Sequence, residues 1–91
     1  MAGFSARGTS GELRVGYKVV STFTRWTMQD DRVEAHGSPV DGYWRDSGQP
    51  FSIHLKVGRS VWIWRMVDVT HGSPMVIAVV GSPEVQHTVM A

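Results

Sequence analysis

Histidine and carboxylate side chains are the groups in this 91-residue sequence that could do chemistry, because the chain has no cysteine. The four histidines, His36, His54, His71 and His87, stand far apart, and none of their spacings is typical of a metal-binding motif. A shared site for His36 and His71 would need two separate loops to meet. We therefore expect no metal and no cofactor.

Catalytic motifs are equally scarce. Nucleophilic catalysis would need a serine, and the serines cluster in turn-like segments without a Gly-x-Ser-x-Gly elbow. No Gly-x-x-x-x-Gly-Lys loop is present to cradle a phosphate. The acids of residues 30–46 could pair with a histidine for acid–base work, but no spacing favours this. The sequence predicts a protein that is not an enzyme.

One segment with the residue types of a protein interface lies in a glycine- and proline-rich stretch. Tyr43, Trp44 and Arg45 are of the types that dominate interface hot spots. Their aromatic rings could be exposed anchors for a partner, or they could fold back as a lid over the core. Both interpretations stay open at this point.

A second segment combines bases with aromatic rings, as surfaces that bind single-stranded nucleic acid do. Here Lys56, Arg59 and Arg65 would supply the contacts to nucleic acid. Alternation, however, places Trp62 and Trp64 on the most apolar face of this segment, which favours a core role for both rings.

The elements that must position these residues begin with a β-hairpin over residues 51–67. Two alternating runs flank Gly58-Arg59, and glycine at the first central position suits a two-residue type II′ turn. The turn sets the register. It predicts Val57–Ser60, Leu55–Trp62, Ile53–Trp64 and Phe51–Met66 on one face, and Lys56–Val61, His54–Ile63 and Ser52–Arg65 on the other.

The second face of this hairpin and its continuation also carries apolar side chains, namely Val61, Ile63, Val67 and Val69. A sheet with one buried face does not need them. Either the sheet curls so that they are partly covered, or they meet another subunit. Val61, Ile63 and Arg65 therefore join the Tyr43–Arg45 segment as candidate partner-binding residues.

The remaining pattern is also β-like. Residues 12–27 alternate with a change of phase near Val19-Val20, which predicts one bent strand or two strands with a bulge there. Residues 28–32 read as a turn and 32–36 as a short strand. Residues 75–80 are apolar on both faces and read as a doubly covered strand, and 85–89 as a short last strand.

Composition supports an all-β class, since only Leu13 and Leu55 are leucines while the chain has 10 glycines and 4 prolines. We expect a single-domain β-barrel or β-sandwich of about five to seven antiparallel strands. Residues 1–11 would form an extended, flexible N-terminal arm. Residues 12–91 would form one β domain with a long loop at 37–50.

The net charge of +1 conceals blocks of alternating sign, +3 over residues 1–29, −3 over 30–46, +3 over 47–65 and −2 over the rest. Such blocks could match a neighbouring subunit. No apolar run is long enough for a membrane span, and the first residues lack the apolar core of a signal peptide. We expect a location in a virion or in the cytoplasm of the producing cell.

The arm, the two apolar faces and the charge blocks together favour a non-catalytic assembly protein with protein partners, as a homo-oligomer, part of a larger assembly, or both. A small viral (phage) virion component, such as a capsid decoration, cement or head–tail connection subunit, is the leading hypothesis. One alternative is an SH3-like or OB-like module that binds single-stranded nucleic acid or a peptide. Another is an inhibitor of a host enzyme acting through the 38–50 loop.

Overall fold

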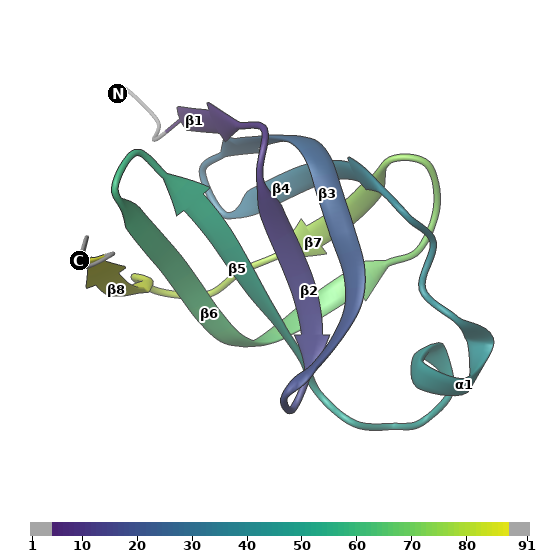
Figure 1. Cartoon of the computed structure of the whole chain (residues 1–91). Helices are drawn as coiled ribbons and strands as arrows, with labels where there is room; N and C mark the ends of the chain where they lie inside the picture. The colour runs from purple at the N-terminus through teal and green to yellow at the C-terminus, as the bar shows by residue number, and fades with distance from the viewer. Residues whose placement is uncertain (1–4, 88–91) are drawn as a thin grey trace.

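Antiparallel strands form most of the regular structure in the computed structural model, which describes residues 5–87 (Figure 1). The all-β class is thus confirmed. The strands are β1 (Ser5–Gly8), β2 (Gly11–Val15), β3 (Lys18–Gln29), β4 (Arg32–Gly37), β5 (Phe51–Val57), β6 (Ser60–Thr70), β7 (Met75–Ala78) and β8 (Glu84–His87). A one-turn helix, α1 (Gly42–Arg45), lies between β4 and β5.

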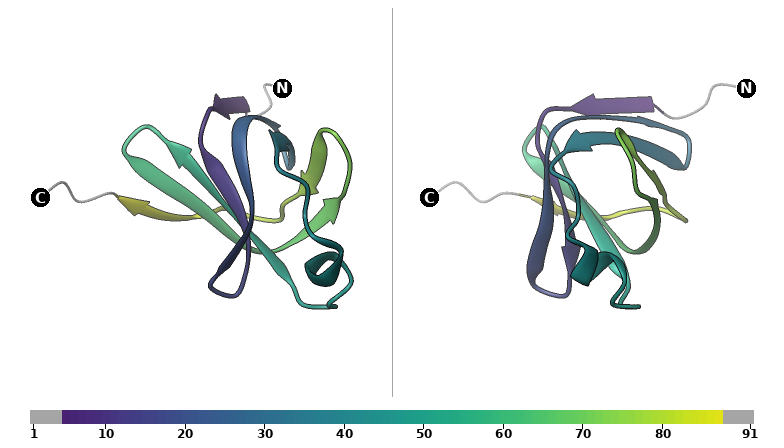
Figure 2. Two further views of the ribbon diagram at one scale, coloured as in Figure 1. Left: turned by 45° about the vertical axis from the view of Figure 1, so that its right-hand side comes forward. Right: turned by 90° about the vertical axis from the view of Figure 1, so that its right-hand side faces the viewer.

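Six of these strands close into a barrel (Figures 1 and 2). β2, β3 and β4 form one meander, and β5, β6 and β7 form a second. β2 pairs with β5 and β4 pairs with β7, which joins the two meanders at both edges. β1 and β8 are outer strands that add to β3 and β6, beside the barrel strands already paired there.

Two-residue turns connect three of the strand pairs. Gly16, Asp30 and Gly58 occupy the first central positions, with φ of 60°, 56° and 60°. A positive φ there is what a type II′ turn requires, and glycine adopts it without steric cost. The pairs Val57–Ser60, Leu55–Trp62, Ile53–Trp64, Lys56–Val61 and His54–Ile63 are confirmed.

The predicted register is wrong beyond Ile53–Trp64, because β6 contains a bulge. Phe51 faces Val67 instead of Met66, and Met66 has φ 72° with 79% of its surface exposed. The extra residue shifts the alternation by one position. Val67 and Val69 therefore pack with the core. The apparent second apolar face of this segment is shorter than the sequence suggested.

A second bulge lies where the change of phase predicted one. Leu13 faces Ser21 and Arg14 faces Val19, so Val20 is the extra residue in β3. The alternative of two strands over residues 12–27 is the right one. Their turn at Gly16-Tyr17 has glycine at its first central position, as the Gly58-Arg59 turn does, and it leaves Tyr17 fully exposed.

Both ends of the described chain differ from expectation. Ser5–Gly8, within the segment expected to be an arm, is strand β1 paired with β3. The last strand covers 84–87, and the expected Val89 lies outside the described residues. In the 75–80 run, Met75, Ile77 and Val79 are buried but Val80 is exposed, so this run is covered on one face only.

The connection from β4 to β5 covers part of the barrel core. Val40 is buried in the core cluster, and Trp44 packs against it from α1. The start of the connection is fixed by the Ser21 hydroxyl, which donates to the Ser38 carbonyl at 2.5 Å, and by the Ser38 amide, which donates to Thr22 O at 3.3 Å. The long loop is thus a packed element rather than a free one.

Gly37 provides a test of this close packing. A Cβ at Gly37 would lie 2.2 Å from the Thr22 carbonyl oxygen, a backbone atom. We expect Gly37→Ala to lower the free energy of unfolding by about 1–3 kcal/mol, since β3 and β4 must move apart. Gly42→Ala is the matched control, because its Cβ would meet only the Arg45 side chain, at 3.6 Å. Equal stability of the two variants in urea titration would contradict the packing described here.

Candidate functional site

The outer face of β2, β5, β6 and β8 brings together charged residues on both sides of the β5–β6 hairpin. Across the strands, Glu12 faces His54, His54 faces Ile63, and Ile63 faces Glu84. Ile63 is only 3% exposed although it does not belong to the barrel core cluster. It therefore acts as a covered apolar centre beneath polar neighbours, and no exposed contact surface of Ile63 is left for a partner.

Ion pairs surround this centre. Arg65 donates to both carboxylate oxygens of Glu84, with Nη2 at 3.2 Å from each, and Gln86 Nε2 donates to Glu84 Oε2 at 3.0 Å. The Gln86 and Arg65 hydrogen bonds lower the pKa of the Glu84 carboxyl. On the other side of His54, Arg14 pairs with Glu12. Arg65 thus ties β8 to β6 through its side chain.

His54 is the titratable group at the middle of this face. Its partial burial is the main cause that lowers its pKa, and the Arg14 guanidinium lowers it further, while Glu12 opposes the shift. Arg65 and Glu84 act in opposite directions at longer range. Folding therefore shifts the equilibrium of His54 toward the neutral imidazole.

The Tyr43–Arg45 segment lies in the short helix α1, and the structure places its two aromatic rings in different environments. Asp41 caps the helix, since its Oδ1 accepts from the Tyr43 amide at 2.8 Å. Trp44 packs against the core, whereas Tyr43 is 71% exposed and meets the Trp44 ring edge-on with centroids 4.9 Å apart. Tyr43 is therefore the exposed ring of this segment, and Trp44 is the ring that packs against the core.

The two groups of candidate partner-binding residues do not meet. α1 lies at the lower right of Figure 1, whereas the β5–β6 turn and the neighbouring first half of β6 lie at the left. Val61 and Arg65 consequently belong to a different surface from Tyr43 and Arg45. If both surfaces contact partners, they contact different ones or different parts of one large partner.

The basic residues of the nucleic-acid alternative do not face the aromatic rings. Lys56 and Arg65 lie on the outer face and Arg59 lies in the turn, while Trp64 is buried and its Nε1 donates to Gly81 O at 3.1 Å. Trp62 is half-buried and contacts Trp64 edge-on at 6.2 Å. Arg65 is also occupied by Glu84. A stacking platform beside free cations is therefore not formed here.

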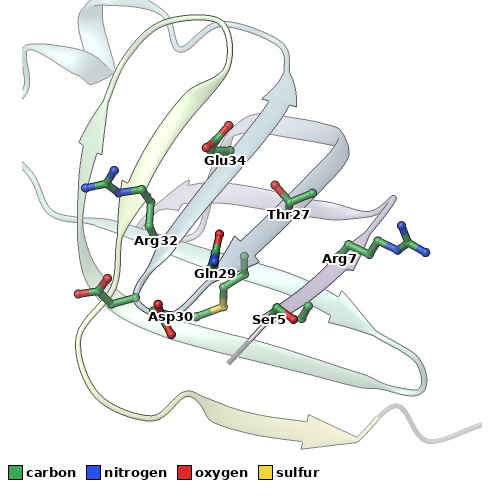
Figure 3. Close-up of a pocket in the computed structure, with 10 residues that line it drawn as sticks. Ser5, Arg7, Thr27, Gln29, Asp30, Arg32 and Glu34 are labelled. Carbon is green, nitrogen blue, oxygen red and sulfur yellow. The ribbon is translucent and has the colours of Figure 1, made fainter. Parts of the chain in front are cut away.

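Depressions on the surface of residues 5–87 include three whose linings can be compared. The largest of these three, of about 780 Å³, lies over β1, β3 and the β3–β4 turn and is lined mostly by polar residues, among them Arg7, Gln29 and Arg32 (Figure 3). Figure 3 shows the side chains of Arg7 and Arg32 pointing in opposite directions, so they do not converge on one ligand. A second, of about 490 Å³, lies between Arg45 and Met66.

The third depression has an aromatic lining and leads to β8. It measures about 370 Å³ and is bounded by Met28, Trp62, Trp64 and Val85, together with Asp30 and the residues 81–83. Val85 is 47% exposed at its margin. Val85 was not among the residues that the sequence singled out as candidates for a site, and its place in a short strand after Gly81-Ser82-Pro83 was the signal that could have pointed to it.

The histidines are dispersed. The His36 ring lies 3.4 Å from Arg25, and His71 packs edge-on against Phe51 at 5.7 Å. Partial burial is the main cause that lowers the pKa of His71, with Arg45 adding to it. Within residues 5–87, no three His, Asp or Glu side chains form a group that could hold a metal ion.

Comparisons of this chain with protein-family models, curated proteins and solved structures gave no match to any of them. None of the helices in the described part of the chain is long and apolar enough to cross a membrane. Function must therefore be argued from the chemistry of these surfaces.

The pKa of His54 tests the electrostatics of the outer face. Because its pKa is lower in the folded than in the unfolded chain, the free energy of unfolding should decrease as pH falls below about 6.5. An NMR titration should give a His54 midpoint below that of an unfolded peptide, and Arg14→Gln should move it upward. Arg25→Gln, which removes a cation beside His36 instead, should leave it unchanged. A His54 midpoint at or above the peptide value would contradict the account.

Proposed function

We propose that this chain is a non-catalytic assembly protein that works through protein–protein contacts, of the class of small viral (phage) virion components. The observation that carries the proposal is the presence of two outer strands on a closed barrel. A closed barrel leaves no free strand edge, and exposed edges are templates for pairing with another chain. The outer strands β1 and β8 therefore provide free strand edges that the closed barrel itself lacks.

The two outer strands support pairing in different ways. All four residues of β8 are exposed, and the pairing of this strand within residues 5–87 is with β6 alone. β1 pairs with β3, and its inward residues Ala6 and Gly8 lie against the barrel, Gly8 close to the Trp26 ring. Each strand offers one further edge, so one subunit could contact two neighbours. This is the valence that a ring or lattice needs.

A second candidate function rests on Tyr43. An exposed tyrosine braced by a packed tryptophan has the form of a binding hot spot. This surface suits docking into a pocket of a partner protein, as the inhibitor hypothesis requires. The assembly proposal remains the stronger one, because it accounts for two strands of the fold rather than one side chain.

Sedimentation velocity of the isolated chain tests the assembly proposal. From about 1 to 500 µM, the weight-average mass should rise from that of one chain to that of a dimer or larger species, as weak edge pairing predicts. A matched run of a variant carrying both Arg7→Pro and Val85→Pro should stay at the mass of one chain. A wild-type chain that remains a monomer over the whole range would overturn the proposal.

A further inference from the structure

The direction of each backbone amide in β8 can be worked out from the hairpin. In a two-residue β-hairpin, the residues that flank the turn exchange both backbone hydrogen bonds, and the direction then alternates along each strand. Val57 and Ser60 flank the turn, so Ser60 faces β5 and Val61 faces β8. The Lys56 amide agrees with this alternation, since it points away from β6 and donates to Ser10 O at 3.1 Å.

The same alternation fixes the directions within β8. Gln86 faces Val61 and Glu84 faces Ile63, so the backbone groups of Gln86 and Glu84 are directed at β6. The N–H and C=O groups of Val85 and His87 are consequently directed away from the barrel. Figure 2 (left) shows β8, in yellow, extending outward from the barrel, and no other strand within residues 5–87 lies on its far side.

We infer that this free edge pairs with the β8 edge of a second copy of the same chain, antiparallel and about a two-fold axis. The inference rests on the proposed assembly function and names its partner. The register is the one in which Gln86 faces Gln86 of the second copy. Val85 then faces His87 of the second copy, and every outward N–H and C=O of both strands gains a partner.

The neighbouring register is less favourable. With Val85 opposite Val85, each His87 would face the Pro83 position of the other copy, and proline has no N–H to donate. Pro83 thus limits pairing to the part of the strand that begins after it. The Gln86-centred register satisfies two donors and two acceptors on each strand, which selects it over the alternative.

Side chains at the edge are compatible with this arrangement. Two Gln86 amides can donate and accept reciprocally across the axis. The one charged carboxylate in the strand, Glu84, is held by Arg65 of its own chain, and it faces no second acid among residues 84–87 in this register. The exposed Val85 would be covered by His87 of the second copy, at the margin of the groove that contains Trp62.

The edge also lacks the features that usually prevent edge pairing. Natural edge strands are protected by lysine, proline, bulges or covering elements. Val85, Gln86 and His87 include neither lysine nor proline, and the pairing of β8 with β6 runs without a bulge. β1, by contrast, places Arg7 on its outward side. The second copy is therefore assigned to β8 rather than to β1.

Disulfide cross-linking tests the register between the two β8 strands directly, because the chain has no cysteine of its own. Directly opposed residues of a pair without mutual hydrogen bonds have Cα atoms about 4.5 Å apart, which a disulfide can bridge. Gln86→Cys should therefore form a covalent dimer on mild oxidation at concentrations where the wild-type chain self-associates. Ser5→Cys, an exposed position on β1, is the matched control and should remain mostly monomeric.

A proline variant tests the hydrogen bonds of the edge. Val85→Pro removes one outward N–H donor from each copy without removing a hydrogen bond to β6. The dissociation constant of the dimer should therefore rise at least about tenfold. Arg7→Pro does the same to β1 and should leave the dimer unchanged. Unaltered Trp62 and Trp64 NMR signals in both variants would show that the barrel is folded.

The outcomes separate this inference from the proposed function. Dimers that persist in Val85→Pro, with no cross-link in Gln86→Cys, would overturn pairing at β8 and leave assembly through β1 or another surface. A wild-type chain that is monomeric at all concentrations would overturn both. Cross-linking of Gln86→Cys together with loss of association in Val85→Pro would support both.

Discussion

Barrel closure is the constraint on which the rest of this structure depends. A chain of this length has room for one core, and the closed six-stranded barrel surrounds that core with strands whose edges are all paired. Closure requires β3 to pair with both β2 and β4, and β6 to pair with both β5 and β7. The outer strands β1 and β8 then add to the same two long strands. These two long strands need bulges to bend, at Val20 in β3 and at Met66 in β6.

The bulge at Met66 also explains which part of the fold the sequence could predict. Between residues 53 and 64, period-two alternation and the glycine turn agree, so every predicted pair in that stretch is present. Beyond Arg65 the sequence continues to alternate, but the bulge at Met66 reverses which residues face the core. Glycine would have marked a position with positive φ, whereas methionine gives no such signal. Val67 and Val69 were assigned to the wrong face for that reason.

The candidate site, too, could be predicted from the sequence only in part. The residue types of Tyr43 and Trp44 left open whether their rings are exposed or cover the core, because only packing against the core decides which ring is exposed. β1 was missed because its partner lies about twenty residues away in β3, and its own residues, Ser-Ala-Arg-Gly, have weak β propensity. The outward direction of the Val85 amide follows from the register of β5 with β6, which the turn sets, together with the pairing of β8 with β6. The sequence does not reveal that second pairing.

The edge of β8 carries the central claim, and amide hydrogen exchange of residues 84–87 measures it most directly. The amides of Glu84 and Gln86 bond within the chain, so they should be protected at every protein concentration. Those of Val85 and His87 should exchange fast in dilute solution and become protected as concentration rises, because they point away from β6 and the proposed second copy supplies their partners. Fast exchange of Val85 and His87 at all concentrations would contradict the account.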